Sequence, residues 1–153
     1  MKETMTIGNI CNRTVVWATE DTTIKQAAEL MRDQHVGSVV VVQQADAGLI
    51  VTGILTDRDI AIVAVARDFD PFTLKVADVM SAQPVTVGEE DSIVDAMAQM
   101  RNRGIRRVPV TTGTGVLVGI VTLDDLLDIV AQELQALVQV ITSERRQEAR
   151  TRP

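Results

Sequence analysis

Two short stretches of the sequence carry a threonine and an aspartate at the same spacing. Residues 53–60 read GILTDRDI, and residues 119–126 read GIVTLDDL. At the start of a helix, a threonine and an acidic residue three positions later can form a capping box. The same carboxylate can accept hydrogen bonds from two adjacent hydroxyls, as a ribose offers. The N-terminus of the helix that follows attracts anions such as phosphate.

Either motif alone is better explained as a helix cap, because short motifs often arise by chance. The cap would pair Thr56 with Asp59 in the first motif and Thr122 with Asp125 in the second. Capping and binding are compatible, since a threonine that caps a helix can also lie beside a bound anion.

Catalytic chemistry finds little support in the sequence. The chain has one histidine and one cysteine, and no glycine-rich phosphate loop of the Walker type. His35 reads as a cation at a helix C-terminus, and Cys11 reads as a small packing residue. We therefore predict that the protein is not an enzyme and has neither catalytic residues nor a metal site.

The overall charge narrows the choice of partners. The 153-residue chain has a formal net charge of −6, which argues against nucleic acid as its main ligand, because such binding needs a basic face. The N-terminal residues contain no apolar signal segment, and no apolar run approaches the length of a membrane span. We expect a cytoplasmic protein without membrane contact.

An internal duplication organises the elements that would position the two motifs. TIGNIC (6–11) has its counterpart in KVADVM (75–80), and AAELMRDQHVGSVVVV (27–42) has its counterpart in AMAQMRNRGIRRVPVT (96–111). Each copy contains a short strand, a helix with apolar residues at helical spacing, two β-branched strands and a second helix. We predict an α+β fold built from two strand–helix–strand–strand–helix units. The first repeat would span residues 5–70 and the second residues 71–132.

The last predicted helix outruns the repeat. Residues 133–153 form a C-terminal extension that continues the apolar stripe before ending in a polar tail. This stripe could form a lid over the protein's own core. The alternative is a contact between two copies, which we favour because two-fold homodimers are the commonest oligomers.

The combined motifs resemble a tandem pair of CBS domains, which are modules of the cystathionine-β-synthase type. The resemblance covers about residues 5–132 and is most specific in VMSAQPVTV (79–87), GIRRVPV (104–110) and GIVTLDDL. It implies two units related by pseudo-two-fold symmetry and packed through their sheets. It also implies clefts between them that bind adenosine-containing ligands such as AMP, ADP, ATP or S-adenosylmethionine, without an obligatory cofactor.

The resemblance further implies which residues share each cleft. The first cleft would contain Thr56, Asp59, Val85 and the turn Ile105-Arg106-Arg107. Two arginines suit a phosphorylated ligand, because the fork-shaped guanidinium matches phosphate. A solvated basic surface is the alternative interpretation of this pair.

The second cleft would contain Thr122 and Asp125 opposite Val16 and the turn Val36-Gly37-Ser38. That turn carries no cation, so we expect the second cleft to take a ligand with less phosphate or to stay empty. Arg107 is the residue that could blur this difference, because it could reach either cleft.

The function implied is that of a stand-alone regulatory module. It would sense adenine nucleotides, form a homodimer and transmit a change of conformation to an effector protein of unknown identity. The alternative is a structural or interaction dimer whose clefts are empty or vestigial.

Overall fold

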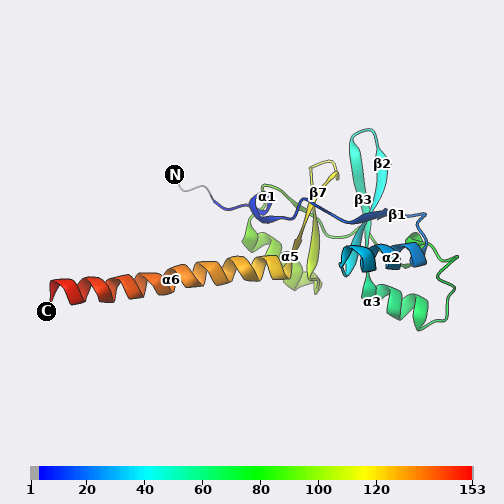
Figure 1. Ribbon diagram of the computed structural model, residues 1–153. Helices are drawn as coiled ribbons and strands as arrows, with labels where there is room; N and C mark the ends of the chain where they lie inside the picture. The colour runs from blue at the N-terminus through cyan, green and yellow to red at the C-terminus, as the bar shows by residue number, and fades with distance from the viewer. Residues whose placement is uncertain (1–3, 153) are drawn as a thin grey trace.

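The computed structural model describes residues 4–152 and shows the chain folded as two similar units (Figure 1). The first unit contains β1 (Trp17–Thr19), α2 (Ile24–Gln34), β2 (Ser38–Ala45), β3 (Gly48–Thr56), α3 (Asp57–Asp59) and the π-helical turn η1 (Ile60–Val65). The second contains β5 (Val87–Gly88), α5 (Ile93–Arg103), β6 (Arg107–Thr111), β7 (Leu117–Thr122) and α6 (Leu123–Thr151). Three short elements precede the units: α1 (Ile7–Ile10), α4 (Val76–Val79) and β4 (Ser81–Ala82). The predicted order of strands and helices in each repeat is confirmed.

Both sheets follow one pairing scheme. In the first unit β1 pairs parallel with β2, and β2 pairs antiparallel with β3. In the second unit β5 pairs parallel with β6, and β6 pairs antiparallel with β7. Each central strand carries one bulge at the matching place, between Val41 and Val42 and between Val110 and Thr111. The predicted α+β class is therefore confirmed, with the duplication visible down to the register of the strands.

Capping explains where the main helices begin and end. The side chain of Thr23 accepts a hydrogen bond from Gln26 N–H at the start of α2, and Ser92 does the same for Asp95 N–H at the start of α5. Both helices end on a residue in the left-handed conformation, His35 and Gly104. Such an ending reverses the chain so that the next strand runs back beside the helix.

Each unit has its own aliphatic core. In the first core Val39 and Val41 of β2 pack with Ala27 and Met31 of α2. The alternate β2 residues Val40 and Val42 are also almost fully buried, although they are not part of this core. In the second core Val108 and Val110 of β6 take the corresponding places against Ala96 and Met100 of α5.

The segment that precedes each unit in the sequence packs on the other unit. Ile7 of α1 lies in the second core, and its N–H donates to the carbonyl oxygen of Asp91 at 2.9 Å. Two further hydrogen bonds of 2.9 Å join Asn12 to Ile120 of β7. Figure 1 shows the result, because the N-terminal segment runs past β7 before the chain enters the first unit.

The reciprocal contact closes the first unit. Val76 and Val79 of α4 are buried in the first core, and Val76 N–H donates to Thr22 O at 2.8 Å. Strand β4 then adds to the free edge of β3 as the fourth strand of that sheet. Each core is thus completed by a distant segment of the chain. The first core needs α4, which precedes the second unit, and the second core needs α1, which precedes the first unit.

Two glycines permit these crossings. A Cβ on Gly119 would lie 2.8 Å from Asn12 O and 2.9 Å from the Cys11 sulfur, and a Cβ on Gly53 would lie 3.0 Å from Ser81 O. These separations are too short for a side chain, so the backbone of each crossing segment approaches its strand only because glycine is there.

Replacing Gly119 with alanine is expected to destabilise the fold by about 1–3 kcal/mol, because the new methyl group meets backbone that cannot move aside cheaply. The measurement is thermal unfolding followed by circular dichroism, with a lower Tm expected. Gly113→Ala is the matched control, since a Cβ there meets nothing within 4 Å. Equal Tm values for the two variants would contradict the close-approach argument.

Candidate functional site

The two Thr-x-x-Asp motifs form the predicted capping boxes. Thr56 N–H donates to Asp59 Oδ2 at 2.9 Å, and Asp59 N–H donates back to Thr56 Oγ1 at 3.1 Å. The corresponding distances for Thr122 and Asp125 are 3.0 and 3.2 Å. Each box uses one carboxylate oxygen, so the second oxygen of each aspartate can accept hydrogen bonds from another molecule.

A backbone hydrogen bond ties each motif to the turn that follows the first helix of its unit. Asp57 N–H donates to Gly37 O at 3.0 Å, and Leu123 N–H donates to Arg106 O at 2.8 Å. The two bonds occupy equivalent positions in the duplication. They hold the end of each hairpin against the turn that enters its central strand.

The first predicted cleft is a cavity of about 330 Å³ between the units. Thr56 and Asp59 line it from the first unit, and Val85 and the turn Ile105-Arg106-Arg107 line it from the second. All the residues predicted for this cleft therefore lie together. Its remaining lining residues are Ile54, Asp57, Arg58, Ser81, Pro84 and Gly104.

The second predicted cleft is smaller, with a cavity of about 190 Å³. Thr122 lies there together with Val16, Val36, Gly37 and Ser38, as the sequence predicted. Asp125 is not among the lining residues, although its capping box matches that of Asp59, which lines the first cleft. Asn12, Thr14, Val15, Arg107 and Ile120 complete the lining.

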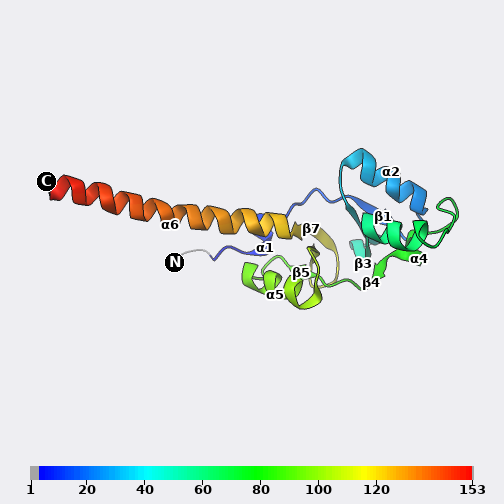
Figure 2. The same cartoon turned by 90° about the horizontal axis from the view of Figure 1, so that it is seen from below.

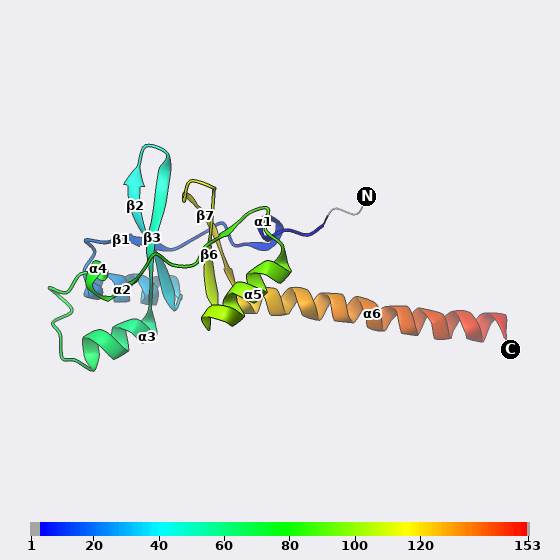
Figure 3. The same ribbon diagram turned by 180° about the vertical axis from the view of Figure 1, so that it is seen from behind.

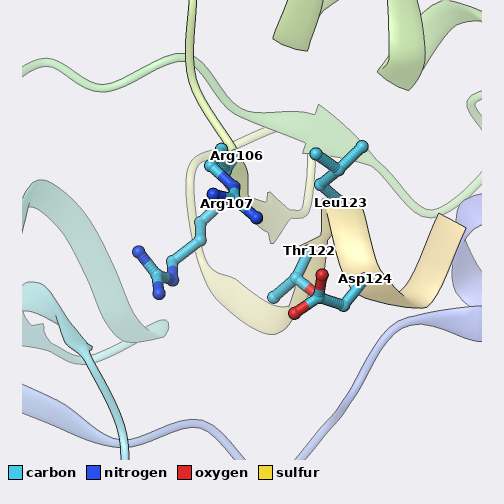
Figure 4. A pocket seen from close by; sticks show the side chains of 5 residues that line it. All are labelled: Arg106, Arg107, Thr122, Leu123 and Asp124. Carbon is cyan, nitrogen blue, oxygen red and sulfur yellow. The ribbon is translucent and has the colours of Figure 1, made fainter. Parts of the chain in front are cut away.

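A third cavity of about 210 Å³ lies at the start of α6 (Figure 4). It is lined by Arg106, Arg107, Thr122, Leu123 and Asp124. Two arginines and Asp124 thus line a space at the first residues of a long helix. The helix N-terminus favours an anion there, and the Asp124 carboxylate opposes one.

Arg107 lines all three cavities. Its Nη2 atom lies 3.2 Å from the position that a Cβ on Gly37 would occupy, so the guanidinium rests against the turn of the first unit. Figure 4 shows the side chain extending away from Leu123 and Asp124. The turn at Gly37 contains no lysine or arginine, but Arg107 of the second unit supplies a positive charge to the second cleft beside that turn. The two clefts therefore differ less in charge than the sequence predicted.

Sequence reasoning missed Asp57, Arg58 and Asn12 as cleft residues. Asp57 and Arg58 occupy the two variable positions inside Thr-x-x-Asp, where nothing in the motif demands a particular side chain. Asn12 enters through the crossing of the N-terminal segment over β7. Its alignment with Ser81, which lines the first cleft, is the signal that could have identified it.

Within residues 4–152 no group of three or more histidine, cysteine, aspartate or glutamate side chains is placed to hold a metal ion. No helix within the same range is both long and apolar enough to cross a lipid bilayer.

The family comparison matches the CBS domain twice, over residues 7–65 and 76–132. A CBS domain-containing protein of Bacillus subtilis, YhcV, is 38% identical over 126 residues, which cover 82% of this chain and 81% of that protein. An uncharacterized protein of Methanopyrus kandleri is 34% identical over 125 residues. The match covers 82% of this chain and 62% of that longer relative.

Solved structures share the fold. The CBS domain pair of protein MJ0100, solved with 5′-methylthioadenosine and S-adenosyl-L-methionine, superposes with a TM-score of 0.75 at 22% identity, covering 86% of this chain and 99% of that one. CBSX2, solved with AMP, has a TM-score of 0.69 at 22% identity, with coverages of 83% and 96%.

Asp125→Ala is expected to lower the stability by about 1 kcal/mol, because Thr122 N–H loses its acceptor and the helix loses a favourable charge in its first turn. A fall in Tm at equal protein concentration is the measurement. Asp128→Ala is the control, since this exposed carboxylate lies in the next turn, outside the capping box. A Tm that falls equally in both variants would show that the box contributes nothing specific.

Proposed function

This chain belongs to the CBS-domain family, and we propose that it is a regulatory module that binds an adenosine-containing ligand between its two units. The observation that carries the proposal is the composition of the first cleft. A capping-box aspartate from one unit and two arginines from the other line the same cavity of about 330 Å³. AMP, ADP, ATP and S-adenosylmethionine are the ligand candidates, and the AMP and S-adenosylmethionine complexes of proteins with the same fold support them.

Different residues of the first cleft would contact the ribose, the phosphate and the adenine of the ligand. Asp59 would accept hydrogen bonds from the two ribose hydroxyls through the oxygen that the capping box leaves available. Arg106 and Arg107 would donate to phosphate, with Thr56 near the junction of ribose and phosphate. Val85 and Ile105 would pack against the adenine ring.

The second cleft would take the same class of ligand with Thr122, Val16, Gly37 and Ser38. Asp125 does not line this cavity, so its side chain would have to move before it could contact a ribose there. Arg107 is the single cation that both clefts share. A phosphorylated ligand in one cleft would therefore engage Arg107 and leave the other cleft without it. The first cleft also contains Arg106, so it is the favoured site for AMP or ATP.

Regulation would follow from the position of the clefts between the units. A ligand that contacts both units favours the arrangement in which its contacts are complete, and it shifts the equilibrium only by its difference in affinity for the two arrangements. The change would pass to an effector protein in the cytoplasm, and the module would act without catalysing a reaction itself.

The test is a titration with AMP, ADP, ATP and S-adenosylmethionine, followed by calorimetry and by the shift in Tm. AMP or ATP is expected to raise the Tm of the wild-type protein, because a ligand that binds only the folded state stabilises it. Asp59→Ala and Arg107→Ala should each weaken binding tenfold or more, which corresponds to the loss of about 1.4 kcal/mol.

Arg101→Ala is the matched control, because this exposed arginine lies on α5 outside all three cavities. It removes the same charge and should leave the affinity unchanged. No response to any of the four ligands would reject the sensor and leave the interaction dimer with vestigial clefts. Loss of binding only with Asp125→Ala would assign the ligand to the second cleft instead of the first.

A further inference from the structure

Helix α6 projects far beyond the folded body. It runs without interruption over 29 residues, and Leu126 is its only buried residue within the part of the chain that the structure describes. Figures 1 and 2 show the helix leaving the second unit and extending away from both units, and Figure 3 shows the same from behind. Neither glycine nor proline occurs between residues 123 and 152, so nothing bends the helix back into the lid that the sequence left open as an alternative.

One side of α6 is apolar and exposed. Leu127 is 55% exposed, Leu134 61%, Leu137 64% and Ile141 54%. Together with Val130 and Val138 they form what we call the α6 stripe. Its members recur at the three- and four-residue spacing that places side chains along one face of a helix, which is the spacing of a coiled-coil seam. The opposite side carries Gln132 and Gln139.

Charge is distributed unequally along the same helix. Its first part, through Ser143, contains acidic residues and no lysine or arginine; the acids are Asp124, Asp125, Asp128 and Glu133. The last part is basic overall, with Arg145, Arg146, Arg150 and Arg152 against Glu144 and Glu148. One helix thus has an acidic beginning, an apolar middle and a basic end.

We propose that the α6 stripe is the docking surface for a second copy of this chain, with the two α6 helices paired antiparallel. In the register that keeps apolar layers together, Val130 packs against the partner's Ile141. Leu134 packs against the partner's Leu137, and the two-fold axis passes between this layer and its symmetry-equivalent copy. The same surface serves both copies, as a two-fold interface requires.

Charge selects the antiparallel arrangement. In this register Asp124 comes opposite the partner's Arg145, once at each end of the paired helices. The two helix dipoles point in opposite directions, so the positive end of one helix lies beside the negative end of the other. A parallel pair would instead place Glu144 opposite Glu144 and Glu148 opposite Glu148 along the seam. Like charges facing each other there are unfavourable, so the parallel arrangement lacks the complementarity that the antiparallel one has.

The register also connects the interface with the candidate site. Asp124 lines the third cavity together with Arg106 and Arg107. The partner's Arg145 would therefore lie at the rim of that cavity. The pairing of α6 itself needs no ligand, so it can be tested independently of nucleotide binding.

The first test measures the mass of the full chain in solution by light scattering during gel filtration, at increasing protein concentration and without nucleotide. The expected mass is twice the 16.6 kDa of one chain. Leu134→Lys should give the monomer, because it places two charges at the centre of the apolar layers. Gln139→Lys introduces the same charge on the opposite side and should remain a dimer.

Both positions are exposed in a single chain and lie outside the two cores, so the thermal unfolding of the two units should not change in either variant. A wild-type chain that stays monomeric would overturn the proposal. The partner that covers the α6 stripe would then be a different protein. A Leu134→Lys variant that stays dimeric would place the interface elsewhere.

The second test determines the orientation by disulfide trapping in a Cys11→Ala background, which removes the only native cysteine. Leu127→Cys, carrying an affinity tag, is mixed with untagged Glu144→Cys and oxidised. Antiparallel pairing should give the mixed disulfide, because the two positions face each other across the seam. Each variant alone should not cross-link, since equivalent positions then lie about 25 Å apart, beyond the reach of a disulfide.

Self-cross-linking of Leu127→Cys or Glu144→Cys without the mixed product would show parallel helices and reject the proposed arrangement. This outcome would leave the nucleotide proposal untouched. Conversely, formation of the mixed disulfide in a protein that binds no nucleotide would support the α6 interface and reject only the proposed sensor function.

Discussion

The reciprocal crossing of two chain segments is the constraint on which the rest of the structure depends. Residues before the first unit complete the core of the second, where Ile7 is fully buried. Val76, before the second unit, is fully buried in the core of the first. An exchange of this kind couples the two units, because neither can unfold without exposing part of the other's core. The close approaches at Gly53 and Gly119 are the local condition for both crossings.

The crossing also explains why the candidate clefts are made from both units. Strand β4 brings Ser81 beside the end of β3, so that Val85 and the arginine turn face Thr56 and Asp59. Asn12 has the same relation to β7 in the second cleft. The aspartates owe their positions to hydrogen bonds within the capping boxes, which leave one carboxylate oxygen of each free for a ligand. Structural and proposed functional roles therefore fall on the same side chains.

Several features of the candidate site were predictable from local pattern and from the resemblance between the two halves. The capping boxes follow from Thr-x-x-Asp, and the contents of the first cleft follow from the family resemblance. The position of Asp125 outside the second cavity was not predictable, because the same motif and the same capping box place Asp59 in the lining of the first cleft. Arg107 lines both clefts because a long side chain at the start of β6 can extend to Gly37, a reach that depends on the packing of the units.

The order of the elements, the duplication and the amphipathic character of α6 follow from local sequence patterns. These are properties of neighbouring residues: apolar spacing, caps and turn residues act over a few positions of the chain. Only the folded protein shows which core each crossing segment joins, that Arg107 lines both clefts and that the α6 stripe is exposed. Those outcomes depend on contacts between residues far apart in the chain, whose geometry no local pattern specifies.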